Sequence, residues 1–90
     1  MDFEWDEIKA AANERKHGLT FEEAIRIFEN FVYSRSDHRK DYGEKRTINL
    51  GRLSNRFIVA VVTTERDNVT RVISARPMSR RERAIYEEET

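Results

Sequence analysis

The run Phe57–Thr63, Phe-Ile-Val-Ala-Val-Val-Thr, constrains the fold of this chain more than any other feature. Successive residues of a β-strand point to opposite faces of the sheet, so a strand with one solvated face alternates apolar and polar residues. This run is apolar on both faces. It therefore predicts a central strand in a sheet that is covered on both sides.

The neighbouring residues predict three more strands, at Phe31–Ser34, Glu44–Gly51 and Val69–Arg76. A turn is expected at Leu53–Arg56, and the links between the strands have the length of hairpin loops. Links this short join antiparallel neighbours, because parallel strands need long crossover connections.

Helix signals flank the predicted strands. Asp6 is expected to cap a first helix that runs to about Lys16 and stops at Gly18. The expected face of this helix comprises Ile8, Ala11, Ala12 and Arg15. Thr20 and Glu23 form a capping box that opens a second helix. Its expected buried stripe comprises Phe21, Ala24, Ile25 and Phe28.

A second capping box, Ser79 with Glu82, opens a last short helix through Tyr86. The chain is thus predicted to be a single α+β domain over residues 1–90. We expect two N-terminal helices packed on an antiparallel sheet of about four strands, followed by a short C-terminal helix.

Charge is distributed unevenly along a chain whose formal net charge is zero. From Arg35 to Arg83, thirteen Lys and Arg residues stand against six Asp and Glu residues, whereas the residues before Arg35 and after Arg83 are acidic. Thirteen of the seventeen cations are arginine, whose fork of donors matches phosphate and carboxylate geometry. This asymmetry points to a polyanionic partner, with RNA first; the alternative is a solvated surface of ion pairs.

Several kinds of site are unsupported by the sequence. The chain has no cysteine, its two histidines have no metal-ligand spacing, and its three glycines form no phosphate-binding loop. The longest apolar run is far shorter than the roughly 20 residues that span a bilayer, and the first residues are acidic rather than basic. We expect a cytoplasmic protein that needs no metal or other cofactor and has no membrane partner.

Arginines near the last predicted strand are the first candidates for function. Arg76 ends that strand beside a helix N-terminus, whose free amides favour an anion. Arg80, Arg81 and Arg83 follow closely. Four guanidinium groups so near one another need a negative partner. The tail Glu87–Glu89 is one alternative, and we favour an external phosphate or acidic protein.

Other candidates lie elsewhere in the sequence. Arg46 and Arg71 are on predicted strands, where the alternative for Arg71 is an ion pair that closes a sheet edge. His17, beside Lys16 at the end of the first helix, is a possible proton carrier or a cap that complements the helix dipole. Tyr86 lies one turn from Arg83, where a phenol can stack on a base or move a proton.

One ordered set of motifs spans nearly the whole chain. It comprises Phe3-x-Trp5-Asp6, Lys9, Asn13, Lys16-His17-Gly18, Phe21-Glu22-Glu23-Ala24, Phe28, Gly43-Glu44-x-Arg46, Gly51, Arg71-x-Ile73-Ser74-Ala75-Arg76, Glu82-Arg83 and Tyr86. In this set and this order the chain resembles the BrnT toxin family. The resemblance implies a ribonuclease toxin of a type II toxin–antitoxin system, with a RelE-like fold. It also implies a BrnA-like antitoxin that neutralises the toxin and through which the complex binds operator DNA.

The family's catalytic pattern is carried over by position. Arg76 matches an arginine of the last strand, Arg46 an arginine of an earlier strand, and Tyr86 a C-terminal tyrosine. The expected reaction is metal-free attack by the RNA's own 2′-hydroxyl, with His17 or Glu44 as the base. The residues expected to bind RNA are Lys16, Arg71, Arg80, Arg81 and Arg83. The alternative is a module that binds RNA or an antitoxin without chemistry.

Overall fold

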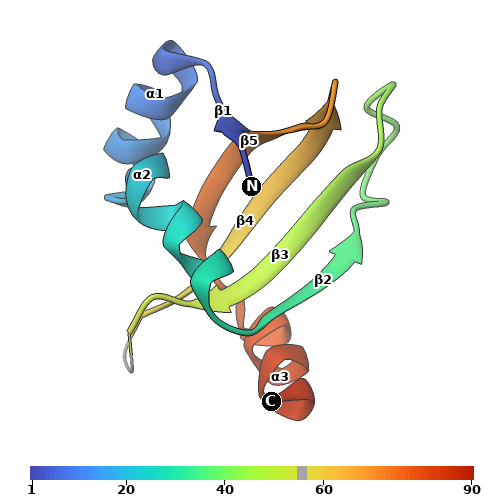
Figure 1. Cartoon of the computed structure of the whole chain (residues 1–90). Helices are drawn as coiled ribbons and strands as arrows, with labels where there is room; N and C mark the ends of the chain where they lie inside the picture. Colours follow the sequence, from blue (N-terminus) through green and yellow to red (C-terminus); the bar gives the residue numbers. More distant parts are fainter. Residues whose placement is uncertain (55–56) are drawn as a thin grey trace.

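The computed structural model describes residues 1–54 and 57–90, and within them the chain forms an α+β fold built on a five-stranded sheet (Figure 1). The helical elements are α1 (Glu7–His17), α2 (Phe21–Ala24), the 3₁₀ helix η1 (Ile25–Glu29) and α3 (Arg80–Glu89). The strands are β1 (Phe3–Glu4), β2 (Val32–Ser36), β3 (Arg46–Arg52), β4 (Ile58–Arg66) and β5 (Val69–Pro77). None of the helices in this part of the chain is long and apolar enough to cross a membrane.

The strand order is β1-β5-β4-β3-β2, which puts β4 in the middle of the sheet. The predicted central strand is therefore confirmed. Val59 and Val61 of β4 belong to one buried cluster, and Ala60 and Val62 belong to another on the opposite face. The pairs β2–β3, β3–β4 and β4–β5 are antiparallel, as the short links predict. Of the predicted turn at Leu53–Arg56, residues Asn55 and Arg56 lie outside the described residues.

The prediction of about four strands was wrong by one. Phe3 and Glu4 form β1, which pairs in parallel with β5 opposite Thr70 and Arg71. The backbone N–H of Thr70 also donates to the carbonyl of Asp2 at 2.9 Å. A strand of two residues is too short to display a period of two, so the sequence pattern shows only an extended lead-in.

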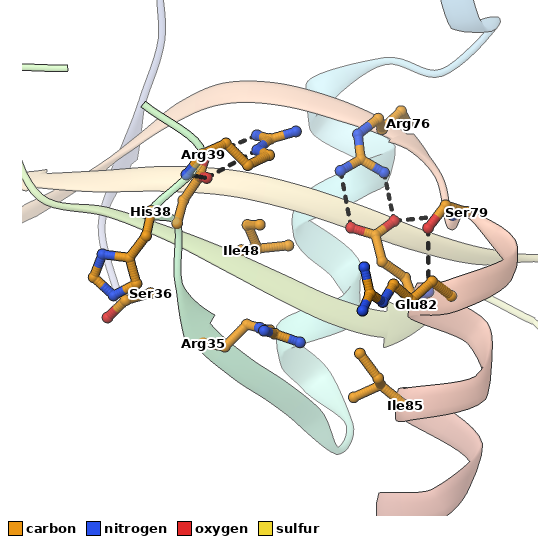
Figure 2. A pocket seen from close by; sticks show the side chains of 11 residues that line it. Arg35, Ser36, His38, Arg39, Ile48, Arg76, Ser79, Glu82 and Ile85 are labelled. Atoms are coloured by element: carbon orange, nitrogen blue, oxygen red, sulfur yellow. Dashed lines mark hydrogen bonds and ion pairs between the residues drawn. The ribbon is translucent and has the colours of Figure 1, made fainter. Parts of the chain in front are cut away.

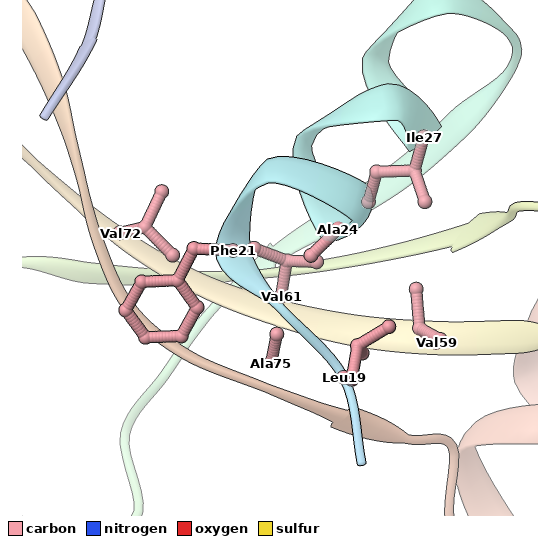
Figure 3. Packing of buried hydrophobic residues seen from close by; sticks show 8 residues of the cluster. All are labelled: Leu19, Phe21, Ala24, Ile27, Val59, Val61, Val72 and Ala75. Atoms are coloured by element: carbon pink, nitrogen blue, oxygen red, sulfur yellow. The ribbon is translucent and has the colours of Figure 1, made fainter. Parts of the chain in front are cut away.

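One face of the sheet is covered by α1, α2 and η1 (Figure 1). Figure 3 shows the cluster beneath α2 and η1, in which the helical residues lie over β4 and β5. The cluster comprises Leu19, Phe21, Ala24, Ile27, Val59, Val61, Val72 and Ala75. Thr20 caps α2 through the predicted box, accepting from the N–H of Glu23 at 3.0 Å. These contacts attach the first third of the chain to the sheet.

Two predicted helix faces need correction. Ile8 of α1 is 81% exposed, and the residue that α1 buries is Asn13. The second helix remains α-helical only to Ala24 and continues as η1, so Ile27 is fully buried while Ile25 and Phe28 are partly exposed. A 3₁₀ helix has three residues per turn and so keeps Ile27 on the face of Phe21 and Ala24, whereas a period of 3.6 counted from Phe21 turns Ile27 away from that face.

At one end of the opposite sheet face lies α3 (Figure 1). Its Tyr86 is 3% exposed and packs in a cluster with Ile48, Leu50, Ala60 and Val62. The predicted capping box is present, because Ser79 Oγ accepts from the N–H of Glu82 and the Glu82 side chain accepts from the N–H of Ser79. The helix covers only part of this face, and the remainder carries the candidate site.

Candidate active site

The face of the sheet opposite α1 and α2 carries four arginines on three strands, β2, β3 and β5. Residues paired directly across a ladder point to the same face. Arg35 pairs with Ile48, Arg46 and Arg71 both pair with Thr64, and Arg76 pairs with Ala60. We call this face of the sheet, which carries Arg35, Arg46, Arg71 and Arg76, the arginine face. Folding brings these four residues together from separate parts of the sequence.

An open pocket of about 750 Å³ lies on this face, where β2 and the loop after it meet the end of β5 and the start of α3 (Figure 2). Its lining residues are Arg35, Ser36, Asp37, His38, Arg39, Ile48, Arg76, Ser79, Arg81, Glu82 and Ile85. Four arginines and one histidine therefore share a single pocket with two carboxylates. Such a concentration of guanidinium groups favours an anionic ligand.

Arg76 is held by Glu82 on the α3 side of this pocket. Its Nη1 and Nη2 atoms donate to Glu82 Oε1 and Oε2 at 2.6 and 2.9 Å, as Figure 2 shows. Burial on its own would raise the pKa of Glu82, but the hydrogen bonds from Arg76 and from the Ser79 N–H outweigh it and lower that pKa. Glu82 is therefore an ionised carboxylate at neutral pH that both caps α3 and orients Arg76.

Asp37 holds a second arginine in the same way. Its side chain is fully buried, and Arg39 donates to it from Nε at 2.8 Å and from Nη2 at 2.7 Å. These hydrogen bonds hold the pKa of Asp37 well below its ordinary value of 3.8, against the opposing effect of burial. The forked contact sets the direction in which the half-exposed Arg39 guanidinium points.

Arg35 and Arg81 have no such partner. Within residues 1–54 and 57–90, neither side chain forms an ion pair or a hydrogen bond, and both are exposed. Arg35 extends from β2 towards α3 in Figure 2, whereas the His38 imidazole lies at the edge of the pocket away from Arg76. Of the arginines that line the pocket, Arg35 and Arg81 can therefore bind an incoming anion without giving up an ion pair or a hydrogen bond.

The remaining arginines of the face are paired. Arg46 Nε donates to Glu44 Oε2 at 3.1 Å, and Arg66 donates to Glu44 Oε1 at 2.9 Å. The hydrogen bond from Arg66, and then that from Arg46, lowers the pKa of Glu44. Arg71 donates to Glu4 at 2.7 Å, which is the ion pair at a sheet edge that stood as the alternative for this residue. Arg46 and Glu44 share the face with the pocket without lining it.

The other predicted site residues lie outside the pocket. His17 and Lys16 end α1, which packs on the opposite face of the sheet, so His17 is not brought near Arg76. Tyr86 is buried against the sheet, with the Phe31 ring centroid at 6.3 Å from its own. Arg80 and Arg83 are exposed on α3. In the described chain, no ion pair joins the tail Glu87–Glu89 to the arginines of this helix.

Sequence reasoning missed the contribution of the segment Arg35–Arg39. The strand predicted there ends at Ser34 and the residues after it were given no role, and only the pairing of Arg35 with Ile48 brings them opposite Arg76 and Glu82. The sequence does hold one local signal for this segment. Asp37 and Arg39 are two residues apart, and the Arg39 guanidinium donates to both oxygens of the Asp37 carboxylate. A metal site has no support here, because no group of three or more His, Asp and Glu side chains in the described residues could hold an ion.

Comparison with known proteins identifies a family and a related crystal structure. A family model described as the ribonuclease toxin BrnT of type II toxin–antitoxin systems matches residues 5–82. The crystal structure of the Brucella abortus ribonuclease toxin BrnT superposes with a TM-score of 0.66 at 28% sequence identity, covering 89% of this chain and 99% of that one. No curated protein sequence matches the chain. The family match covers most of the chain, the pocket residues of β5 and the start of α3 included.

Proposed function

The chain belongs to the BrnT family of ribonuclease toxins of type II toxin–antitoxin systems, and from this premise we propose that its arginine-lined pocket is where it cleaves RNA. The observation that carries the proposal is the convergence of Arg35, Arg39, Arg76 and Arg81 on one open pocket. Phosphate oxygens are the ligands such a cluster binds best, and RNA supplies them in a row.

The proposed reaction is transesterification within the RNA. The 2′-hydroxyl oxygen attacks the adjacent phosphorus, the bond from phosphorus to the 5′-oxygen breaks, and the products carry a 2′,3′-cyclic phosphate and a 5′-hydroxyl. Arg35 and Arg81 bind the phosphate directly, and Arg76 joins them by exchanging one of its two contacts with Glu82. Guanidinium groups that are already in place stabilise the charge that develops on the phosphorane.

The reaction also needs a group that takes the 2′ proton and one that returns a proton to the leaving 5′-oxygen. The pocket offers Glu82 on its α3 side and His38 on the opposite side. Glu82 is ionised and next to Arg76, so we assign it the role of base and His38 that of acid. This geometry favours Glu82 and His38 over His17 and Glu44, which stand outside the pocket.

The other predicted residues take supporting roles in this proposal. Arg46, Arg80 and Arg83 extend the basic surface along which RNA reaches the pocket. Arg71 and Tyr86 act through the fold, Arg71 by tying β1 to β5 and Tyr86 by seating α3. We further propose that the arrangement is RelE-like and that the chain inhibits translation in the cytoplasm. Its antitoxin is BrnA-like, neutralises it, and carries the complex to operator DNA.

The test is to map RNA 5′ ends after induction of the chain in cells. We expect new ends and growth arrest with the wild type, and neither with the double variant Arg35→Ala/Arg81→Ala. This pair is a cleaner probe than Arg76→Ala, which removes the ion-pair partner of the Glu82 carboxylate that caps α3. The matched control is Arg15→Ala/Arg26→Ala, which removes the same charge from α1 and η1 on the other side of the sheet.

A second candidate is a module that binds RNA without cutting it. The pairing of Arg76 with Glu82 favours this alternative, because an arginine whose charge is compensated by a carboxylate stabilises the negative charge of the phosphorane less well. It predicts salt-sensitive retention of RNA and no new 5′ ends. Normal growth and intact RNA on strong induction of the wild type would exclude cleavage.

A further inference from the structure

Phe31 is an aromatic ring left open on the arginine face. It directly precedes β2 and is 53% exposed. Residues 31, 33 and 35 alternate onto one side of the strand, and Tyr33 and Arg35 of this series pair with Leu50 and Ile48 of the arginine face. The Phe31 ring consequently lies on the same side of the sheet as the proposed catalytic pocket.

A second pocket, of about 450 Å³, surrounds this ring. Its lining residues are Asn30, Phe31, Arg52, Leu53, Ser54, Tyr86 and Thr90. The Tyr86 ring backs Phe31 at 6.3 Å between centroids, and the Arg52 guanidinium lies 5.9 Å from the Tyr86 centroid. The floor of the pocket is thus an aromatic pair beside an arginine, with side-chain amide and hydroxyl groups at its rim.

The two pockets lie along the same two elements, β2 and α3. Strand β2 runs from Phe31 in the second pocket to Arg35 in the first, and α3 runs back from Glu82 and Ile85 in the first to Tyr86 in the second. Tyr33 packs between them, on the cluster that contains Tyr86. Four strand residues span roughly 13 Å, so one short stretch of RNA can occupy both pockets.

We propose that this second pocket binds a nucleobase of the RNA substrate, stacked on Phe31. This inference rests on the proposed function. Bases of single-stranded RNA bind proteins by stacking on aromatic rings and guanidinium planes, with their edges hydrogen-bonded to polar groups. Asn30 and Thr90 supply such groups at the rim.

Charge favours a base over a phosphate in the second pocket. The exposed residues Glu87, Glu88 and Glu89 lie at the C-terminal end of α3, where the helix dipole is also negative. A phosphate is repelled there, whereas an uncharged base is not. The phosphates therefore bind in the first pocket, which four arginines line, and the base binds on the aromatic pair of the second.

The other aromatic rings are less suited to stacking. Phe3 packs on Phe28 at 5.4 Å, Trp5 packs on Phe21 at 5.9 Å, and the Tyr42 ring carries the Arg46 guanidinium at 4.0 Å. Among the described residues, Phe57 is the other exposed phenylalanine, at 41%. It lines a different pocket, with Gly18 and Leu19 of the helical side, and so provides a matched control.

The experiment measures kcat/KM of the purified chain on oligoribonucleotides that carry one abasic nucleotide at successive positions. We expect one position at which the abasic nucleotide lowers wild-type kcat/KM at least about fivefold, the low end for base–aromatic stacking. Phe31→Ala should show the same loss on the intact RNA and no further loss with the abasic RNA. Phe31→Tyr should retain the wild-type value, and Phe57→Ala should match the wild type throughout.

Other results would overturn the inference. If the losses from Phe31→Ala and from the abasic nucleotide multiply, the base binds elsewhere. If Phe31→Ala leaves all cleavage unchanged and weakens only inhibition by the antitoxin, the pocket is a protein-docking site. If the wild type cuts nothing, the proposed function fails, and the same comparison by fluorescence binding of 2′-O-methyl oligonucleotides decides the nucleobase site separately.

Discussion

Single buried polar side chains organise both faces of this sheet. Asp37 on the pocket side has a fully buried side chain that accepts three hydrogen bonds from Arg39, one of them from its backbone N–H. Asn13 on the helical side joins α1 to β5. A buried polar group is stable only when it is paired, so each of these residues specifies the position of its neighbours.

The depressed pKa of Asp37 gives folding stability a defined dependence on pH. A carboxyl group whose pKa is lower in the folded state contributes stability above its unfolded pKa, near 3.8, and loses it as the pH falls below that value. We expect the unfolding free energy of the wild type to fall more steeply below about pH 4 than that of Asp37→Asn. At pH 7 the variant should be less stable by roughly 1–3 kcal/mol.

Urea denaturation across a pH series measures both effects. Asp41→Asn is the control, because Asp41 is exposed and its side chain accepts, among the described residues, only the N–H of Gly43, at 2.9 Å. If the unfolding free energy falls equally steeply with pH below pH 4 for the wild type and for Asp37→Asn, the ion pair between Asp37 and Arg39 does not stabilise the fold as proposed.

Asn13 is predicted to tolerate no replacement. Its Nδ2 donates to the carbonyls of Ala75 and Leu19 at 2.8 and 3.2 Å, and its Oδ1 accepts the N–H of Ala75 at 3.1 Å. Asn13→Ala leaves these buried backbone groups unpaired and should cost on the order of 3 kcal/mol. Asn13→Asp should cost more, since its carboxylate faces two carbonyl oxygens. Thermal unfolding measures both, with Ala12→Ser, at an exposed position of the same helix, as the control.

At the scale of elements, the contact between β3 and η1 depends on the absence of a side chain. A Cβ atom added at Gly51 would lie 2.7 Å from the Cβ of Ile27, closer than such atoms can approach. Gly51→Ala should therefore push η1 away from the sheet and destabilise the chain by roughly 1–3 kcal/mol. Adding Ile27→Ala should not rescue it, because alanine keeps the Cβ atom.

Gly43→Ala is the comparison for this prediction. Gly43 has a φ of +72° and open space around its Cβ position, so alanine there strains only the backbone, by about 1 kcal/mol. Chemical denaturation of Gly51→Ala, Gly43→Ala and Gly51→Ala/Ile27→Ala separates steric overlap from backbone strain. A Gly51→Ala variant as stable as the wild type would show that η1 moves without cost.

The elements that sequence predicts well are those whose signal is local. The capping boxes Thr20–Glu23 and Ser79–Glu82 and the doubly apolar strand at Phe57–Thr63 carry their own evidence, and all three are found in the fold. β1 is held by Asp2 and Thr70, which are far apart in the sequence. The apolar residues of α1 form only a weak pattern. The buried face of this helix is set instead by the side-chain amide of Asn13, which reaches β5.

The candidate site likewise has one half with a local sequence signal and one half that depends on long-range pairing. Arg76 and Arg81 flank a capped helix start, which the sequence displays, and both line the pocket. Arg35, His38 and Arg39 join them only because β2 pairs with β3 in one register, and register is a long-range property. Charge composition located the basic half of the chain but could not distinguish Arg71, neutralised by Glu4, from Arg35, which has no partner among the described residues.

At the scale of the whole molecule, a chain with zero net charge presents a basic site on one face. Long-range attraction to RNA is weak when the total charge cancels, so binding depends on short-range contacts between individual guanidinium groups and phosphates. Each such contact on single-stranded RNA releases counterions and adds about 0.7 to the slope of log K against log salt concentration.

The salt dependence of RNA binding therefore counts the arginines in contact with phosphate. For Arg35→Ala/Arg81→Ala we expect the magnitude of this slope to fall by about 1.4, measured by fluorescence anisotropy on a 2′-O-methyl oligonucleotide. Arg15→Ala/Arg26→Ala removes equal charge from the helical side and should leave the slope unchanged. If both double variants reduce the slope equally, RNA responds to the overall charge of the protein, and the pocket on the arginine face has no special part in binding it.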